Sequence, residues 1–322
     1  MDKLLAINNL PIAVIWLVAG FVLLVKGADF FVDGSSSVAK MLKVPSLIIG
    51  LTIVAMGTSL PECAVSVTTA LAKNNELAIA NAVGSNLFNL MVVCGVCAVL
   101  CPLAVQKSTL MKEYPFSVGV AALLLVFGLL GMQVGHLEGI IMLLIFVAFL
   151  LYMVFSALRA RKEGSAVQEE EYKILPVWQC IVFIIGGAAA IVFGGDRVVD
   201  SASFIAEKFG ISQNLIGLTI VAFGTSLPEL VTSAVAAKKK EVDMALGNVI
   251  GSNIFNILMV LGISAAISPM AFIAENAVDI CVLIAFSVIV WLFCWKRQQL
   301  VRWQGAAMLA LYAGYIVYIC LR

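Results

Sequence analysis

One hexapeptide, GTSLPE, occurs twice in this chain, at residues 57–62 and again at residues 224–229. Each copy lies inside a long apolar stretch. A glycine, a proline and two hydroxyl residues weaken the hydrogen-bond ladder of a membrane helix, because proline has no N–H to donate. Each copy ends in a glutamate, and an ionised carboxylate inside a membrane is costly, so its presence indicates a function. The pattern predicts two interrupted membrane helices whose glutamates, Glu62 and Glu229, face each other and hold a cation.

The composition indicates a polytopic membrane protein. Of the 322 residues, 62% are hydrophobic and 12% are charged, whereas about a quarter of a soluble domain is charged. Apolar runs repeatedly reach the roughly 20 residues that span a bilayer core. The first run, which begins at Pro11, lacks a cleavage pattern and is expected to remain as a span. The net charge of +1 argues against nucleic acid as a partner.

Charges, prolines and glycines divide the chain into ten expected spans. They cover residues 12–33, 46–71, 77–100, 115–132, 137–158, 177–200, 212–236, 242–267, 275–295 and 303–321. Residues 159–176 form the only long polar stretch, which we expect to be a cytoplasmic linker between two units, 1–158 and 177–322. Lysine and arginine concentrate in the connections on the side of this linker, so both termini are expected outside.

The chain also contains a longer internal repeat. A shift of 167 positions aligns residues 50–103 with residues 217–270 without a gap, and about half of the pairs are identical. Five spans separate equivalent positions, so the two copies must cross the membrane in opposite directions. The predicted fold is therefore an all-α membrane protein with ten transmembrane helices in two inverted five-helix repeats. Such repeats typically build an ion site at the middle of the membrane.

A second polar cluster follows each hexapeptide. The first copy holds Asn81 and, one helical turn apart on one face, Ser85 and Asn89; the second holds Asn248, Ser252 and Asn256 at the same spacing. We expect Ser85, Asn89, Ser252 and Asn256 to join Glu62, Glu229 and the hexapeptide hydroxyls, which belong to Thr58, Ser59, Thr225 and Ser226. All of these groups are oxygen donors. Calcium binds about six to eight oxygens and sodium also prefers oxygen, whereas zinc and copper favour nitrogen or sulfur.

Backbone carbonyls are expected to add further oxygens to this site. Pro61 and Pro228 cannot donate to the carbonyls of Gly57 and Gly224. The neighbouring carbonyls of Ala55 and Ala222 are expected to be exposed as well.

For the other polar residues, a structural role explains their positions better than a role in ion binding does. Cys94, Cys97 and Cys101 would share a helix face, but no histidine or acid accompanies them, so we interpret them as small core residues. The lysine run 238–240 is interpreted as a topological anchor. The charged residues of the first and sixth spans are expected to pair locally, one helical turn apart: Lys26, Asp29, Asp33, Asp196, Arg197 and Asp200.

Through its doubled GTSLPE and GSN motifs, the chain resembles the cation/calcium antiporter superfamily, specifically the prokaryotic sodium/calcium exchanger branch. The resemblance implies eight helices around an ion site and a loosely attached pair, the first and sixth spans, that slides. It implies these ligands: the backbones of Ala55 and Ala222 with Thr58, Ser59, Glu62, Ser85, Asn89, Thr225, Ser226, Glu229, Ser252 and Asn256. Some members of the family carry an aspartate where this chain has Asn256. The site then holds two carboxylates, which argues against a potassium-coupled mode.

We therefore expect a transporter, not an enzyme, that has no cofactor and functions as a monomer. It would exchange calcium for sodium across the plasma membrane, the inner membrane of a bacterium, by alternating access. Proton-coupled exchange of calcium or another divalent cation remains an alternative, and a cation channel is a further one. Paired carboxylates also occur in intramembrane proteases, but the oxygen-rich, helix-breaking context of the two glutamates fits ion coordination better.

Overall fold

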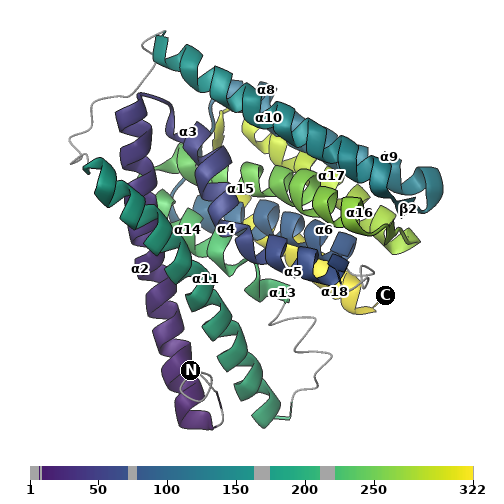
Figure 1. Cartoon of the computed structure of the whole chain (residues 1–322), viewed down its shortest axis with the longest axis horizontal. Coiled ribbons are helices and arrows are strands. Elements are labelled where there is room, and N and C mark those ends of the chain that lie inside the picture. The colour runs from purple at the N-terminus through teal and green to yellow at the C-terminus, as the bar shows by residue number, and fades with distance from the viewer. Residues whose placement is uncertain (1–6, 8, 72–77, 163–174, 211–221, 322) are drawn as a thin grey trace.

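The computed structural model describes residues 7, 9–71, 78–162, 175–210 and 222–321 (Figure 1). Helices dominate it, and three short segments, labelled η, are π-helical. The first half contains α2 (Leu10–Leu42), α3 (Ser46–Ile49), η1 (Gly50–Val54), α4 (Ala55–Thr58), α5 (Leu60–Leu71), α6 (Ala78–Phe88), η2 (Asn89–Val93), α7 (Cys94–Leu100), β1 (Leu103–Ala104), α8 (Lys107–Met111), α9 (Glu113–Gly131), β2 (Gln133–Val134) and α10 (His136–Lys162).

The second half repeats most of this order. It contains α11 (Val177–Lys208), α13 (Ala222–Gly224), α14 (Leu227–Lys238), α15 (Val242–Phe255), η4 (Asn256–Leu261), α16 (Gly262–Ile267), β3 (Met270–Ala271), α17 (Ala274–Trp295), β4 (Gln299–Leu300) and α18 (Arg302–Leu321). Helix α5 shifted by 167 positions coincides with α14, and β1 shifted by the same amount coincides with β3.

The helices are those of a multi-pass membrane protein. Within the described residues, eight are long and apolar enough to cross a membrane, and a ninth span results if the bent pair 46–58 and 60–67 is counted as one. Their positions agree with nine of the expected spans. The remaining one, 212–236, begins among residues that are not described, and most of the expected linker 159–176 also lies there. The count of ten therefore stays a prediction.

Two helices are longer than the sequence predicted. Helix α2 continues from the expected end near residue 33 to Leu42, and α11 continues from residue 200 to Lys208. Hydropathy marks the part of a helix that lies in lipid, whereas the hydrogen-bond ladder continues until a residue interrupts it. In α2 the interruption comes at Lys43, which adopts a left-handed conformation (φ 53°), shortly before Pro45.

Helices α2 and α11 lie side by side and run antiparallel (Figure 1). Glycines allow the close approach: a Cβ atom at Gly27 would lie 2.9 Å from the carbonyl oxygen of Gly187, and one at Gly20 would lie 2.8 Å from that of Gly194. Small residues at such contacts let membrane helices pack without a hydrophobic driving force. The four glycines are also two pairs related by the shift of 167, since Gly20 corresponds to Gly187 and Gly27 to Gly194.

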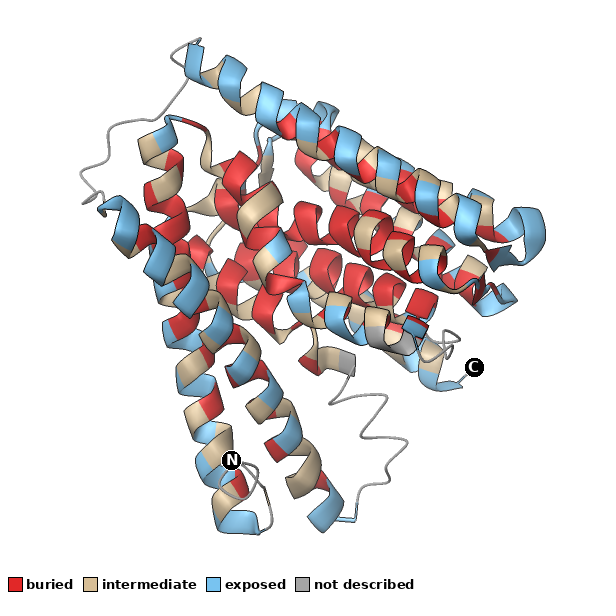
Figure 2. Cartoon of the chain, in the orientation of Figure 1, coloured by how far each residue is buried: buried red, intermediate tan, exposed pale blue. Residues whose placement is uncertain are grey.

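The core lies where the two halves meet. Figure 2 shows buried residues concentrated in α6 and α15, with α9 and α10 exposing one side. Helix α10 of the first half packs on α16, and α18 of the second half packs on α7. The short strands pair across the halves as well, β1 with β4 and β2 with β3. Each half therefore completes its packing with the other.

Candidate functional site

Both hexapeptides break a helix at the same place. Helix α4 ends at Thr58 and α5 begins at Leu60, with a bend of 47° between the segments. In the second copy, α13 ends at Gly224 and α14 begins at Leu227. Ser59 (φ −86°, ψ 11°) and Ser226 (φ −93°, ψ 5°) have nearly the same non-helical backbone. The predicted interruption of these helices is confirmed.

The breaks explain how a carboxylate can be placed here. Pro61 and Pro228 lie in the first turn of the helix that follows, where an N–H has no helical partner and its loss has no consequence. Glu62 and Glu229 lie in the same first turns. The positive end of the helix dipole favours a negative side chain there.

Side chains of the first hexapeptide contact the second half directly. The hydroxyl of Ser59 donates to Oε1 of Glu229 at 2.9 Å, and the hydroxyl of Thr58 donates to Oδ1 of Asn248 at 3.1 Å. Thr58 also lies 3.5 Å from the hydroxyl of Ser252. The two glutamates expose 1% and 0% of their surface and are close enough to interact electrostatically. The structure thus brings together Thr58, Ser59, Glu62, Glu229 and Ser252.

The remaining predicted side chains contribute buried oxygens without a partner. Neither carboxylate oxygen of Glu62 has a hydrogen-bond partner in the described structure, and the same holds for Oε2 of Glu229. Further oxygens of this kind belong to Ser85, Asn89, Thr225, Ser226 and Asn256. Buried polar atoms are normally hydrogen-bonded, so this concentration of unpaired oxygens is unfavourable without a ligand. Oxygen donors of this kind suit a hard cation such as calcium or sodium.

The backbone part of the prediction concerns the carbonyls of Ala55 and Ala222. Ala55 and Ala222 are the first residues of α4 and α13. The carbonyl of Ala55 accepts from the N–H of Ser59 at 3.1 Å, and its second lone pair leaves it able to bind an ion. The last turn of α4 keeps its hydrogen bond, and the chain breaks one residue later.

Four further residues belong to the surroundings of this site. Asn248 accepts from Thr58 and donates to Ser233 at 2.9 Å. Asn86 and Asn253 each donate to the other's backbone carbonyl, at 3.0 and 3.3 Å. The asparagines recur at the shift of 167, as does Ser233 with Ser66. From this recurrence in the sequence, these four residues could have been predicted to lie near the site.

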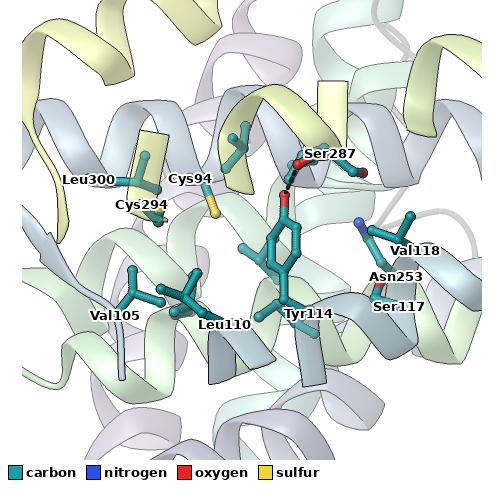
Figure 3. Close-up of a pocket in the computed structure, with 15 residues that line it drawn as sticks. Cys94, Val105, Leu110, Tyr114, Ser117, Val118, Asn253, Ser287, Cys294 and Leu300 are labelled. Atoms are coloured by element: carbon teal, nitrogen blue, oxygen red, sulfur yellow. Dashed lines mark hydrogen bonds between the residues drawn. The ribbon is translucent and has the colours of Figure 1, made fainter. Parts of the chain in front are cut away.

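Two of the three cysteines that were interpreted as core residues are buried, whereas Cys101 is only partly buried. All eight cysteines are free thiols, Cys94 and Cys97 are buried, and the described residues contain no group of acids, histidines and cysteines suited to a metal. Cys94 and Cys294 line a cavity of about 20 Å³ together with Tyr114, whose hydroxyl donates to the carbonyl of Ser287 at 2.9 Å (Figure 3). A cavity of this size holds about one water molecule.

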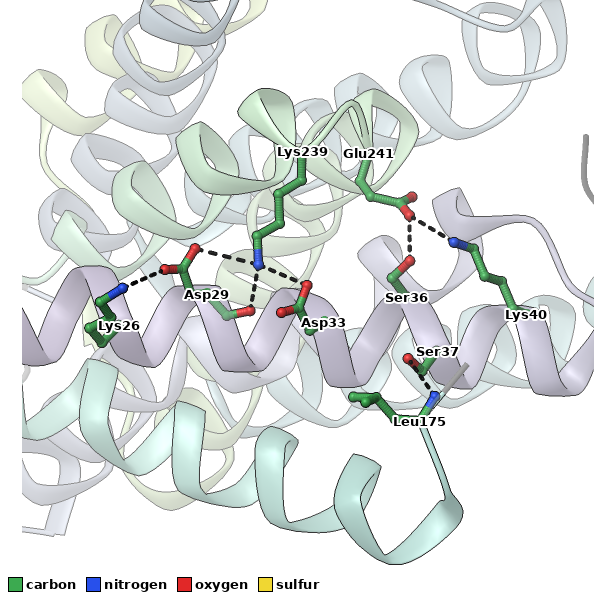
Figure 4. Close-up of polar contacts among 9 residues, drawn as sticks. All are labelled: Lys26, Asp29, Asp33, Ser36, Ser37, Lys40, Leu175, Lys239 and Glu241. Carbon is green, nitrogen blue, oxygen red and sulfur yellow. Dashed lines mark hydrogen bonds and ion pairs between the residues drawn. The ribbon is translucent and has the colours of Figure 1, made fainter. Parts of the chain in front are cut away.

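Two pairs of boundary charges form locally, as expected, whereas Asp33 is paired with a lysine of the other half. Lys26 lies 3.6 Å from Asp29, and Arg197 lies 2.5 Å from Asp200. Lys239 also reaches α2, where its Nζ lies 2.7 Å from Oδ1 of Asp33 (Figure 4). The interpretation of the lysine run as a topological anchor is therefore incomplete, because Lys239 ties α14 to α2.

The comparison with protein families identifies the family of this chain. The profile of the sodium/calcium exchanger protein family matches this chain twice, over residues 12–155 and over residues 180–321. The chain belongs to the sodium/calcium exchanger family. The two matches cover the two halves, so each half by itself carries the features of the family.

Relatives and solved structures agree with this membership. The chain is 40% identical over 311 residues to the putative antiporter CaxA of Alkalimonas amylolytica, covering 94% of this chain and 97% of that protein. It is 36% identical to the inner membrane protein YrbG of Escherichia coli, covering 95% of each. The structure of the sodium-calcium exchanger NCX_Mj, soaked with 2.5 mM Na+ and 10 mM Sr2+, superimposes with a TM-score of 0.83 at 33% identity. That match covers 96% of this chain and 99% of NCX_Mj.

Proposed function

We propose that this exchanger is a secondary active antiporter that exchanges calcium for sodium across the inner membrane by alternating access. One observation carries the proposal: the hydroxyl of Ser59, from the first hexapeptide, donates to Glu229 of the second, beside a Glu62 whose oxygens are buried and unpaired. Two carboxylates balance the charge of one calcium ion. The sodium-calcium exchanger NCX_Mj, which has the same fold, supports sodium as the counter-ion.

The proposed ion site consists of oxygens from both halves. Its side chains belong to Thr58, Ser59, Glu62, Ser85, Asn89, Thr225, Ser226, Glu229, Ser252 and Asn256, and its backbone oxygens to Ala55 and Ala222. The same oxygens would hold either one calcium ion or several sodium ions. Because one set of ligands cannot serve both at once, binding of one ion requires release of the other, which is the basis of exchange.

We infer that the halves are inverted repeats of five spans each, 1–158 and 177–322, joined by the linker 159–176. The antiparallel course of α2 and α11, which occupy equivalent positions in the two halves, supports this arrangement. The strand pairs β1–β4 and β2–β3 support it too, because each joins one half to the other. The lysine and arginine bias supports a cytoplasmic linker and external termini.

A passage beside the helix breaks supports alternating access. Within the described residues, a cavity of about 1190 Å³ extends along α11 to Gly57, Pro61 and Thr225. It includes residues of both breaks. In this proposal, sliding of α2 and α11 would close this passage and open another on the opposite side.

The alternative is proton-coupled exchange, in which a glutamate takes up a proton instead of binding sodium. Calcium uptake into proteoliposomes separates the two, with an outward sodium gradient, an outward proton gradient and no gradient run in parallel. We expect uptake only with the sodium gradient. Uptake driven only by protons would favour the alternative, and gradient-independent flux would favour a channel.

Two variants make this experiment specific to the site. Glu229→Gln removes a carboxylate of the proposed site and should abolish uptake. Glu113→Gln removes another largely buried carboxylate, at the start of α9, and should leave uptake unchanged. Normal uptake by Glu229→Gln would refute the proposed site.

A further inference from the structure

Asn86 lies on α6 beside the proposed ion site, and its hydrogen bonds define how its amide is oriented. Its Nδ2 donates to the backbone carbonyl of Asn253 at 3.0 Å. A flipped amide would place two acceptor oxygens against each other, so Oδ1 of Asn86 must point the other way. There it accepts from Nδ2 of Asn256 at 3.2 Å. Both asparagines are fully buried, so no solvent competes for these bonds.

This contact also orients Asn256. Because its Nδ2 is held by Asn86, its Oδ1 points away from Asn86, and this oxygen is buried without a partner in the described structure. An amide oxygen can bind calcium or sodium, whereas an amide nitrogen cannot. The orientation of Asn256 therefore decides whether its amide oxygen, which can bind a cation, or its amide N–H group, which repels one, faces the ion site.

We propose that Asn86 is a positioning residue that holds the amide oxygen of Asn256 toward the transported ion. The proposal rests on the proposed function, in which Asn256 is a ligand. It gives residue 256 a requirement that position 89 lacks: residue 256 must present a hydrogen-bond donor to Asn86. A carboxylate would place a second acceptor there and would lose the contact.

The equivalent position in the first half provides the comparison. Asn89 corresponds to Asn256, and Asn253 corresponds to Asn86, by the shift of 167. Asn253 donates to the carbonyl of Asn86 at 3.3 Å, but its Oδ1 is unpaired in the described structure, and so are both amide atoms of Asn89. Asn253 thus links the same two helices as Asn86 without orienting an amide of the site, and it is a matched control.

The test measures the calcium concentration for half-maximal transport, KM, in proteoliposomes. Loss of one such hydrogen bond should raise the KM of Asn86→Leu about 2- to 12-fold. Asn86→Ala, which inserts no bulk, should give the same change. Asn253→Leu should leave KM unchanged. In the Asn256→Ala background, where no amide remains to be oriented, Asn86→Leu should have no further effect.

Each other result contradicts the proposal. An unchanged KM in both Asn86 variants, an equal rise in Asn253→Leu, or a full additional rise in the Asn256→Ala background would mean that Asn86 does not act through Asn256. If both Asn86 variants fail to insert while Asn253→Leu inserts, the role of Asn86 is structural. Absence of calcium transport by the unmodified protein would instead refute the proposed function, so the two failures are distinguishable.

Discussion

Replacement of Lys239 by methionine should weaken the contact between α2 and α14 and lower the stability of the protein. The ammonium group of Lys239 lies 2.7 Å from Oδ1 of Asp33, 3.4 Å from Oδ1 of Asp29 and 2.9 Å from the carbonyl oxygen of Asp29 (Figure 4). Methionine keeps most of the apolar length of the side chain, so the change mainly removes the charge.

The expected effect follows from the exposure of these groups. The side chains of Lys239, Asp29 and Asp33 are 28%, 31% and 49% exposed, so solvent screens both ion pairs. Such pairs contribute about 0.2–1 kcal/mol each, and the hydrogen bond to the carbonyl adds about 0.5–1.5 kcal/mol. Because immobilising the long lysine side chain offsets part of this sum, we expect a loss of about 1–2 kcal/mol. This corresponds to about a 5- to 30-fold change in the unfolding equilibrium.

The assay is equilibrium unfolding of the purified protein in detergent micelles, with Lys238→Met as the matched control. Lys238 is the neighbouring lysine; it is exposed, and its side chain makes no hydrogen bond or ion pair within the described residues. The difference between the two variants should shrink in 1 M salt, where screening acts over about 3 Å. Equal stability of the two variants in low salt would refute the reasoning, because removal of charge alone would then explain the result.

Three further predictions concern the repeats, the ion site and the helix contact. Reporters fused after Val105 and after Ala271 should lie on opposite sides of the membrane, and the same side for both would contradict inverted repeats. Asn256→Asp adds a third carboxylate and should change the sodium or proton dependence of calcium uptake; an unchanged dependence would remove Asn256 from the site. Gly187→Leu should destabilise the protein by about 1–3 kcal/mol or more, because its Cβ would lie 2.8 Å from backbone atoms of α2. Gly186→Leu, which meets nothing within 4 Å among the described residues, is its control, and equal unfolding free energies would show that the glycine contact is unimportant.

Local features of the fold were predictable because they depend on local chemistry. Proline and glycine within an apolar run indicated where the helices break, and the breaks occur at Ser59 and Ser226. Apolar length indicated the spans. The carbonyl of Ala55 keeps its helical hydrogen bond with the N–H of Ser59, because the missing N–H of Pro61 affects only the residue that would have paired with it.

Contacts between distant residues could not be derived in this way. The lysine run seemed to be only an anchor, yet Lys239 contacts Asp33, which is 206 positions away. Asn86 contacts Asn256 at a separation of 170 positions. Such pairs depend on how α2, α6, α14 and η4 pack, and local patterns contain no information on that packing.

The sequence by itself determined the family, nine of the membrane spans, the two helix breaks and the oxygen chemistry of the proposed ion site. The two hexapeptides are identical in sequence. Only the tertiary structure made the two copies different: Ser59 donates to Glu229, whereas Ser226 has no partner and both oxygens of Glu62 are unpaired in the described structure. The physical reason is that each hexapeptide is surrounded by residues of both halves, and those residues are similar but not the same. Packing against these residues decides that the hydrogen bond from Ser59 to Glu229 forms and that the equivalent bond from Ser226 to Glu62 does not.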